Sequence, residues 1–275
     1  MNGAFLPDLF LVETIVACLL APPFIGGLVS GVARRYDAIK GGRIAPSLLQ
    51  PFQEVYVALR KKPGTGSYEV YSALVLSMTL QLAALGMLGL LKNLLPVLFL
   101  QAAGLLAMIM AGMFRPVPFI GLSGNHALKA FLTREPILFL VAAGVFFATG
   151  SFSLAAVAEY PRLLAIDLPL LCVVLLFIEQ ESRREPNDVK TESELVFMKL
   201  ANCYRCGTLL LFAGFFFAHS LIGAVIAAIL LHIVLVGLSY VPVHISSSQK
   251  AKWGWGYVYF ATALNLSWIY IKYWQ

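Results

Sequence analysis

The chain has 275 residues, of which 60% are hydrophobic and only 12% are charged. Soluble proteins carry about a quarter charged residues, so this composition excludes a water-soluble enzyme and a disordered chain. The formal net charge of +6 is compatible with nucleic-acid binding, so the placement of the basic residues along the chain has to be considered as well. The apolar segments are continuous rather than alternating, which predicts an all-α integral membrane protein instead of a barrel.

A helix that crosses a bilayer needs about 20 mostly apolar residues. Segments of this kind are found at 9–32, 68–91, 94–114, 136–153, 163–178 and 256–274, with a further pair inside 206–241. The last run is too long for one helix and predicts a tight turn near 219–223. The sequence therefore predicts eight transmembrane helices, with seven as the alternative. Residues 1–8 carry no basic residue, so we expect no secretory signal peptide.

The basic residues favour eight crossings and fix the orientation. With eight crossings, the loops at about 33–67, 115–135, 179–205 and 242–252 share one face and hold 17 of the 20 lysines and arginines. By the positive-inside rule this face is cytoplasmic, and both termini face outward. The same asymmetry accounts for the net charge, so no nucleic-acid partner is expected. We predict one polytopic membrane domain over 1–275, with its main loops in the cytoplasm.

The first cytoplasmic loop contains a predicted amphipathic helix within 46–62. Its apolar residues recur at helical spacing, namely Leu48, Phe52, Val55, Tyr56 and Leu59. Such a helix lies along the membrane surface, and a purely lipid-binding role is the alternative. The preceding Gly41, Gly42 and Pro46 indicate a sharply shaped turn.

Four carboxylates are candidates for a proton path, because charges inside a membrane are costly and are usually functional. Glu135 precedes Pro136, which either starts a span or kinks one that begins near residue 125; in the second case Glu135 lies within the membrane. Glu179 and Glu181 follow a span and point in different directions around the helix, so one of them can face inward. Asp167 is the fourth candidate, with a position at the membrane rim as the alternative.

Metal and cofactor ligands are not predicted. Cys203 and Cys206 form a lone C-x-x-C pair without a second ligand pair. The sequence offers no ligand set for nickel, an iron–sulfur cluster or flavin, so we expect no cofactor bound by this chain.

The loops carry a resemblance to a known family. Gly42-Arg43, Pro46, Gln50-Pro51-Phe52, Glu54 and Arg60 resemble the first cytoplasmic loop of the complex I subunit 1 family. The third loop is similar as well, in Glu181, Arg184, Pro186 and Asp188, and so is Arg134-Glu135-Pro136 in the second loop. The similarity is greatest to the membrane-anchor proteins of energy-converting nickel–iron hydrogenases and the formate hydrogenlyase group.

The resemblance implies a subunit that joins a cytoplasmic redox arm to ion translocation. Its loops would dock the iron–sulfur small subunit and the nickel–iron large subunit, with ferredoxin as electron donor to the complex. Arg43, Gln50, Glu54, Arg60, Arg184 and Asp188 are the implied docking residues. The acids Glu135, Glu179, Glu181 and Asp167 would begin a proton path toward antiporter-like membrane subunits.

Three other functions remain open at this point. The first is the quinone-chamber subunit of a complex I-type NADH or ferredoxin dehydrogenase. The second is a stand-alone secondary transporter, although transporters of that kind tend to contain internal repeats, and the two halves of this chain show none. The third is a structural anchor without an ion path. The electron donor, the end product and the choice between protons and sodium ions are left open.

Overall fold

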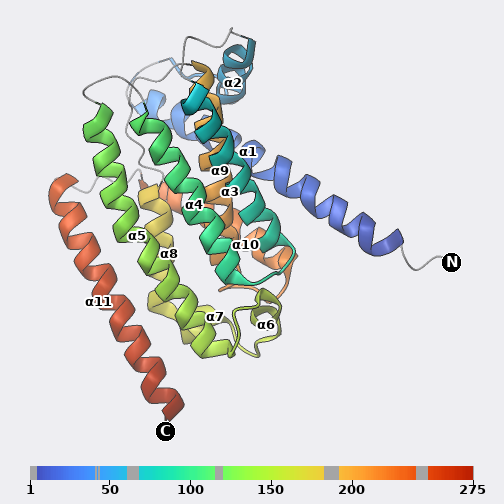
Figure 1. Ribbon diagram of the computed structural model, residues 1–275, viewed down its shortest axis with the longest axis vertical. Helices are drawn as coiled ribbons and strands as arrows, with labels where there is room; N and C mark the ends of the chain where they lie inside the picture. Colours follow the sequence, from blue (N-terminus) through green and yellow to red (C-terminus); the bar gives the residue numbers. More distant parts are fainter. Residues whose placement is uncertain are drawn as a thin grey trace. The chain divides into compact units, whose positions relative to one another are not determined.

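The described part of the protein is helical throughout its regular structure. The computed structural model describes residues 5–40, 42, 44–60, 68–114, 120–182, 192–239 and 247–274. In these residues the helices are α1 (Phe5–Lys40), α2 (Gln50–Arg60), α3 (Tyr68–Gly89), α4 (Leu94–Met113), α5 (Ile120–Thr149), α6 (Leu154–Glu159), α7 (Leu164–Asp167), α8 (Pro169–Ser182), α9 (Glu192–Gly214), α10 (Leu221–Ser239) and α11 (Ser247–Trp274) (Figure 1). The all-α prediction is therefore confirmed for this part of the chain.

The chain forms two compact units. Unit 1 comprises Met1–Leu90, Leu100–Lys129 and Pro186–Gly207, and it contains α1, α2, α3, most of α4 and the greater part of α9. Unit 2 comprises Leu91–Phe99, Ala130–Glu185 and Thr208–Gln275, with most of α5 and the helices α6, α7, α8, α10 and α11. The single domain expected from the sequence stays a prediction.

Three helical segments in the described residues are long and apolar enough to cross a membrane. They are Tyr68–Gly89, Leu94–Met113 and Phe131–Thr149. Helix α3 ends at Gly89 before α4 begins at Leu94, as predicted. Helix α9 ends at Gly214 and α10 begins at Leu221, so the predicted break in this run is present but covers 215–220, earlier than the turn predicted near 219–223. The protein thus has the helices of a membrane protein in these segments.

Two regions differ from the simplest sequence expectation. Helix α5 begins at Ile120 and contains Pro136, which agrees with the alternative of an earlier start. The predicted span at 163–178 is interrupted, because α7 ends at Asp167, Leu168 leaves the helical conformation with φ −125°, and α8 starts at Pro169. Proline suits the first position of a helix, where its missing N–H costs no hydrogen bond.

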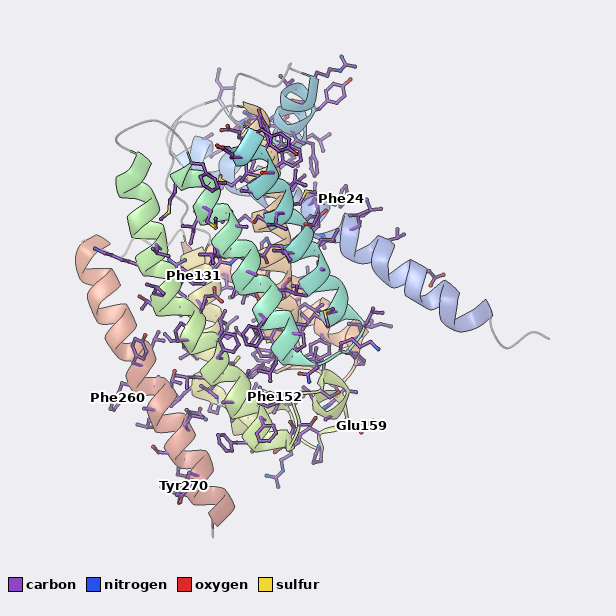
Figure 2. All side chains as sticks on the ribbon, viewed as in Figure 1. Phe24, Phe131, Phe152, Glu159, Phe260 and Tyr270 are labelled. Atoms are coloured by element: carbon purple, nitrogen blue, oxygen red, sulfur yellow. The ribbon has the colours of Figure 1, made fainter. Side chains whose placement is uncertain are left out.

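In unit 2, a side chain of α11 caps the start of α8. Asn265 of α11 is 2% exposed, and its Oδ1 accepts a hydrogen bond of 3.1 Å from the backbone N–H of Leu170. This N–H belongs to the first turn of α8, where the helix itself offers no acceptor. Figure 2 shows Phe260 and Tyr270 on either side of this position along the same α11 helix. Asn265 therefore both packs α11 on α8 and completes the start of α8.

Candidate functional site

Helix α2 is the predicted amphipathic helix, and it rests on α1 within unit 1. Pro51 is buried and Phe52 is half-buried. The Phe52 ring lies with its centroid 5.8 Å from that of Phe24, which Figure 2 labels on α1. A Cβ atom on Gly27 would come within 2.5 Å of the Phe52 ring, so the absence of a side chain at Gly27 makes room for this ring. Phe52 of the predicted apolar face thus packs on α1, whereas Leu48 and Tyr56 of the same predicted face are exposed.

A second glycine of α1 fixes the chain that leads into α2. A Cβ atom on Gly31 would collide with the backbone carbonyl oxygen of Leu48. Because a backbone atom cannot move aside as a flexible side chain can, only glycine fits here without displacing the segment. Gly27 and Gly31 lie one turn apart on the same face of α1. Together with Phe24, Leu48 and Phe52 they form what we call the α1–α2 contact.

Glu54 of α2 is also bonded to α9 within unit 1. The Lys199 Nζ atom lies 3.1 Å from Glu54 Oε2, and the Gln50 amide donates to Glu54 Oε1 at 3.3 Å. The side chains of Lys199 and Glu54 are 32% and 35% exposed, so this ion pair contributes at most about 1 kcal/mol to stability. The ion pair joins α2 to α9. Gln50 and Glu54, two of the residues predicted for docking, therefore contact side chains of this chain itself.

The outer surface of α2 and its leading segment is apolar and basic. Exposed apolar side chains are Ile44 (97%), Leu49 (55%), Tyr56 (54%) and Val57 (49%). The guanidinium carbon of Arg60, a third predicted docking residue, lies 4.3 Å from the centre of the Tyr56 ring, a cation–π arrangement. Arg43, Arg184 and Asp188 lie outside the described residues. We refer to the exposed side chains of 44–60 as the α2 surface.

Helix α9 carries buried charges that sequence reasoning missed. Glu194 and Arg205 are 4% and 3% exposed, and both have interaction partners in the structure. The sequence placed them in a cytoplasmic loop, because charged residues usually indicate a solvated segment. Their spacing with the buried residues Ala201 and Thr208 fits one helix face, and this periodicity was the signal that could have revealed them.

Of the four candidate proton-path acids, the structure describes two side chains, both in unit 2. Glu135 of α5 is 4% exposed, as expected for an acid inside a span, and it has an interaction partner. Asp167, at the end of α7, is half-buried, and its Oδ2 accepts a 2.7 Å hydrogen bond from the Tyr160 hydroxyl. Asp167 is therefore positioned by the turn between α6 and α7.

The other two acids lie at the end of α8. The backbone places Glu179 and Glu181 in its final turn, directly after the fully buried Ile178. Their side chains lie outside the described residues. The two acids follow a buried helical segment, as the sequence pattern indicates. The direction in which either carboxylate points stays a prediction.

A metal-ligating cluster was not predicted for this chain. In the part of the chain that the structure describes, no group of three or more histidine, cysteine, aspartate or glutamate residues is arranged to hold a metal ion.

Comparison with known structures identifies a similar fold. A chain of the membrane-bound sulfane sulfur reductase (MBS), described as an archaeal respiratory membrane complex, superposes with a TM-score of 0.73. The match covers 94% of this chain and 99% of that chain, with 17% sequence identity. At this identity the likeness shows the fold alone. No protein-family model matches the sequence, and the search of curated proteins finds no match. The chain therefore has the fold of a chain from an archaeal respiratory membrane complex.

Proposed function

We propose that this chain is the membrane subunit that links a cytoplasmic redox arm to ion translocation in a respiratory complex related to energy-converting hydrogenases. The observation that carries the proposal is the likeness in fold to a chain of a respiratory membrane complex, which extends over 94% of this chain and 99% of the other. The resemblance of the loop motifs to the complex I subunit 1 family points to the same type of subunit independently of the fold.

In this proposal the chain crosses a prokaryotic cell membrane eight times, with its basic loops on the cytoplasmic side. Three of the crossings are the helical segments that are long and apolar enough to span a membrane. Helices α1, α9, α10 and α11 and the interrupted pair α7–α8 supply the other five. The polar residues of α9 are accommodated by burial within the protein. Seventeen basic residues on one face then follow the positive-inside rule.

The α2 surface is the proposed docking site for the redox subunits. Exposed Ile44, Leu49 and Tyr56 provide apolar contacts, and Arg60 provides a charge. Apolar side chains surrounding an arginine are typical of protein interfaces. The expected partners are an iron–sulfur small subunit and a nickel–iron large subunit, which contain the cofactors, with ferredoxin as donor. Arg43, Arg184 and Asp188 would complete the docking loops.

The acids of unit 2 are the proposed start of the proton path. Glu135 is 4% exposed within α5, and carboxyl groups buried in membrane-spanning helices are usually functional, which supports a place for it in this path. Glu179, Glu181 and Asp167 are the further proton carriers, and antiporter-like subunits would receive the protons.

Purification of the complex from its native membrane tests the assignment. The expected result is co-purification with a nickel-binding large subunit and a small subunit that carries four-cysteine cluster ligands. Replacing Glu181 by Gln should leave this assembly intact and reduce coupled proton movement. A chain that purifies alone and functions by itself as a transporter would contradict the proposal.

The fold match favours a second candidate within the same class. The matched complex is a sulfane sulfur reductase, so a reductase of sulfane sulfur is the alternative to a hydrogenase as the proposed partner of this chain. Metal analysis separates the two, because a nickel–iron centre requires nickel in the large subunit. Assays with quinone analogues address the third possibility, a quinone-reducing complex I-type enzyme.

A further inference from the structure

Three neutral polar side chains are buried on the adjoining helices α3 and α4 of unit 1. They are Ser77 and Gln81 of α3 and Gln101 of α4, each 1% exposed. The Gln81 Nε2 atom donates a 2.9 Å hydrogen bond to the backbone carbonyl of Gln101. A Cβ atom on Gly104 would lie 2.8 Å from the same nitrogen, so this glycine gives the amide its space. We call these three side chains the α3–α4 polar cluster.

The cluster lies in the interior of two candidate membrane-crossing helices. Ser77 and Gln81 are each at least eight residues from the nearer end of α3, and Gln101 lies seven residues inside α4. At 1.5 Å per residue, this places them roughly 10–14 Å from the helix ends. On α3 they interrupt a buried stripe whose next members on either side are Leu74 and Ala84. Bulk water at the helix ends is therefore out of reach of these side chains.

Four polar atoms of the cluster have no hydrogen-bond partner among the described residues. They are Ser77 Oγ, Gln81 Oε1, Gln101 Oε1 and Gln101 Nε2. Other helix hydroxyls in this part of the chain donate to a carbonyl one turn earlier, as Thr79 does to Leu76 and Thr262 to Val258. Ser77 does not. A buried polar group without a partner costs several kcal/mol in a membrane, so one such atom is unusual and four in one cluster indicate a bound ligand.

The chemistry of the cluster selects the ligand. The Gln81 amide is fixed in orientation, because only its nitrogen can donate to the Gln101 carbonyl, and its oxygen therefore accepts. Gln101 presents both a donor and an acceptor, and the Ser77 hydroxyl can act as either. A bare cation needs acceptors only, and the cluster includes no carboxylate to balance its charge. Water donates and accepts, is neutral, and typically makes about three hydrogen bonds in protein interiors.

We propose that the α3–α4 polar cluster binds water molecules in the middle of unit 1 and that this hydrated site relays protons. The relay rests on the proposed function, because it assumes that the complex moves protons. One water molecule accepts a proton and passes a different one of its protons to the next water molecule. The side chains of Ser77, Gln81 and Gln101 therefore neither gain nor lose a proton. The amides and the hydroxyl hold the water in place, which makes these residues positioning residues.

High-resolution electron microscopy of the intact complex tests the water site directly. The expected result is density within hydrogen-bond distance of Gln81 Oε1 and the Gln101 amide, unchanged when sodium or potassium in the buffer is replaced by choline. A dry cluster, with the amides bonded to protein atoms instead, overturns the proposal. So does density that disappears with the alkali cation, because the site would then bind a cation.

Proton uptake into vesicles that contain the complex tests the relay. Gln101→Leu should abolish coupled proton uptake while electron transfer and subunit composition persist, and Ser77→Ala should reduce uptake. Thr79→Val is the matched control on α3, because its hydroxyl is exposed and bonded to its own helix, and uptake should be unchanged. Normal uptake by an assembled Gln101→Leu complex overturns the relay. If the wild-type complex moves no protons at all, the proposed function fails, whereas a dry cluster in a pumping complex defeats only this inference.

Discussion

At the scale of single residues, Glu135 is the more deeply buried of the two proton-path acids whose side chains the structure describes. It is 4% exposed, next to the proline inside α5. Glu159 in unit 2 is exposed and provides a carboxylate of the same type without burial. The contrast between the two separates the effect of a buried carboxylate from that of a surface charge.

We expect Glu135→Gln to abolish coupled proton movement and to leave assembly intact, because glutamine keeps the size and shape of the side chain but its amide cannot carry a proton as a carboxyl group does. Proton uptake by vesicles and the subunit pattern of the purified complex are the two measurements. Glu159→Gln should behave as wild type in both. Unimpaired uptake in the Glu135→Gln complex would remove this residue from the proton path.

The α1–α2 contact depends on one backbone approach, and a single methyl group tests it. Gly31→Ala forces the added Cβ against the Leu48 carbonyl, so the segment that leads into α2 must move. Overpacking of this kind costs about 1–3 kcal/mol. We expect a lower unfolding temperature in detergent together with weaker retention of the redox subunits.

The control for this change is Gly86→Ala on α3, where, apart from its chain neighbours and the backbone of its own helix, no atom of the described residues lies within 4 Å of the new Cβ. Alanine is favoured over glycine inside helices, so stability should be unchanged or slightly higher. If Gly31→Ala behaves like Gly86→Ala, the close approach does not hold α2 in position.

At the scale of helices, the cap that Asn265 gives to α8 makes a specific prediction. Asn265→Leu removes the acceptor for the Leu170 N–H, and loss of a helix cap costs about 1 kcal/mol. Thermal unfolding in detergent should show a lower midpoint. Ser267→Ala lies on the same helix, and its hydroxyl bonds only to its own backbone at Ala263, so the midpoint should stay close to wild type. Equal midpoints for both variants would show that the cap does not stabilise unit 2.

The helices show what sequence reasoning captures and where it fails. Continuous apolar runs are visible in the sequence, so α3 and α4 were predicted correctly. The existence of a break between α9 and α10 was predicted as well, but its position was placed too late in the chain. The short α6 and the interruption at Leu168 were missed, because four to six residues give too little periodic signal. The predicted range of α9 was too short. Its first residues are polar and charged, and such residues were interpreted as part of a loop.

The same distinction between local sequence patterns and long-range packing applies to the candidate site. The amphipathic α2 was predictable because it depends on local spacing, as was the burial of Glu135 beside its proline. The bond between Glu54 and Lys199 joins residues 145 positions apart, and the one between Gln81 and Gln101 depends on how two helices face each other. Pairings of this kind are decided by packing, which a single sequence does not encode in any local pattern.

At the scale of the whole molecule, the number of crossings sets the location of every proposed site. With eight crossings both termini lie outside the cell and the α2 surface lies inside, where ferredoxin is found. With seven crossings the termini lie on opposite faces, and the basic residues no longer gather on one side. The position of the two ends therefore distinguishes the two topologies in a single experiment.

The test uses a protein whose four native cysteines are replaced. Single cysteines are then introduced at the two ends, as Asn2→Cys and Gln275→Cys. We expect a membrane-impermeant maleimide to label both ends in intact cells. The Tyr56→Cys variant, on the α2 surface, should be labelled only after the membrane is permeabilised, because the basic loops face the cytoplasm. Labelling of just one end in intact cells would favour seven crossings. Labelling of position 56 from outside would place the proposed docking surface on the wrong side of the membrane for a cytoplasmic redox arm.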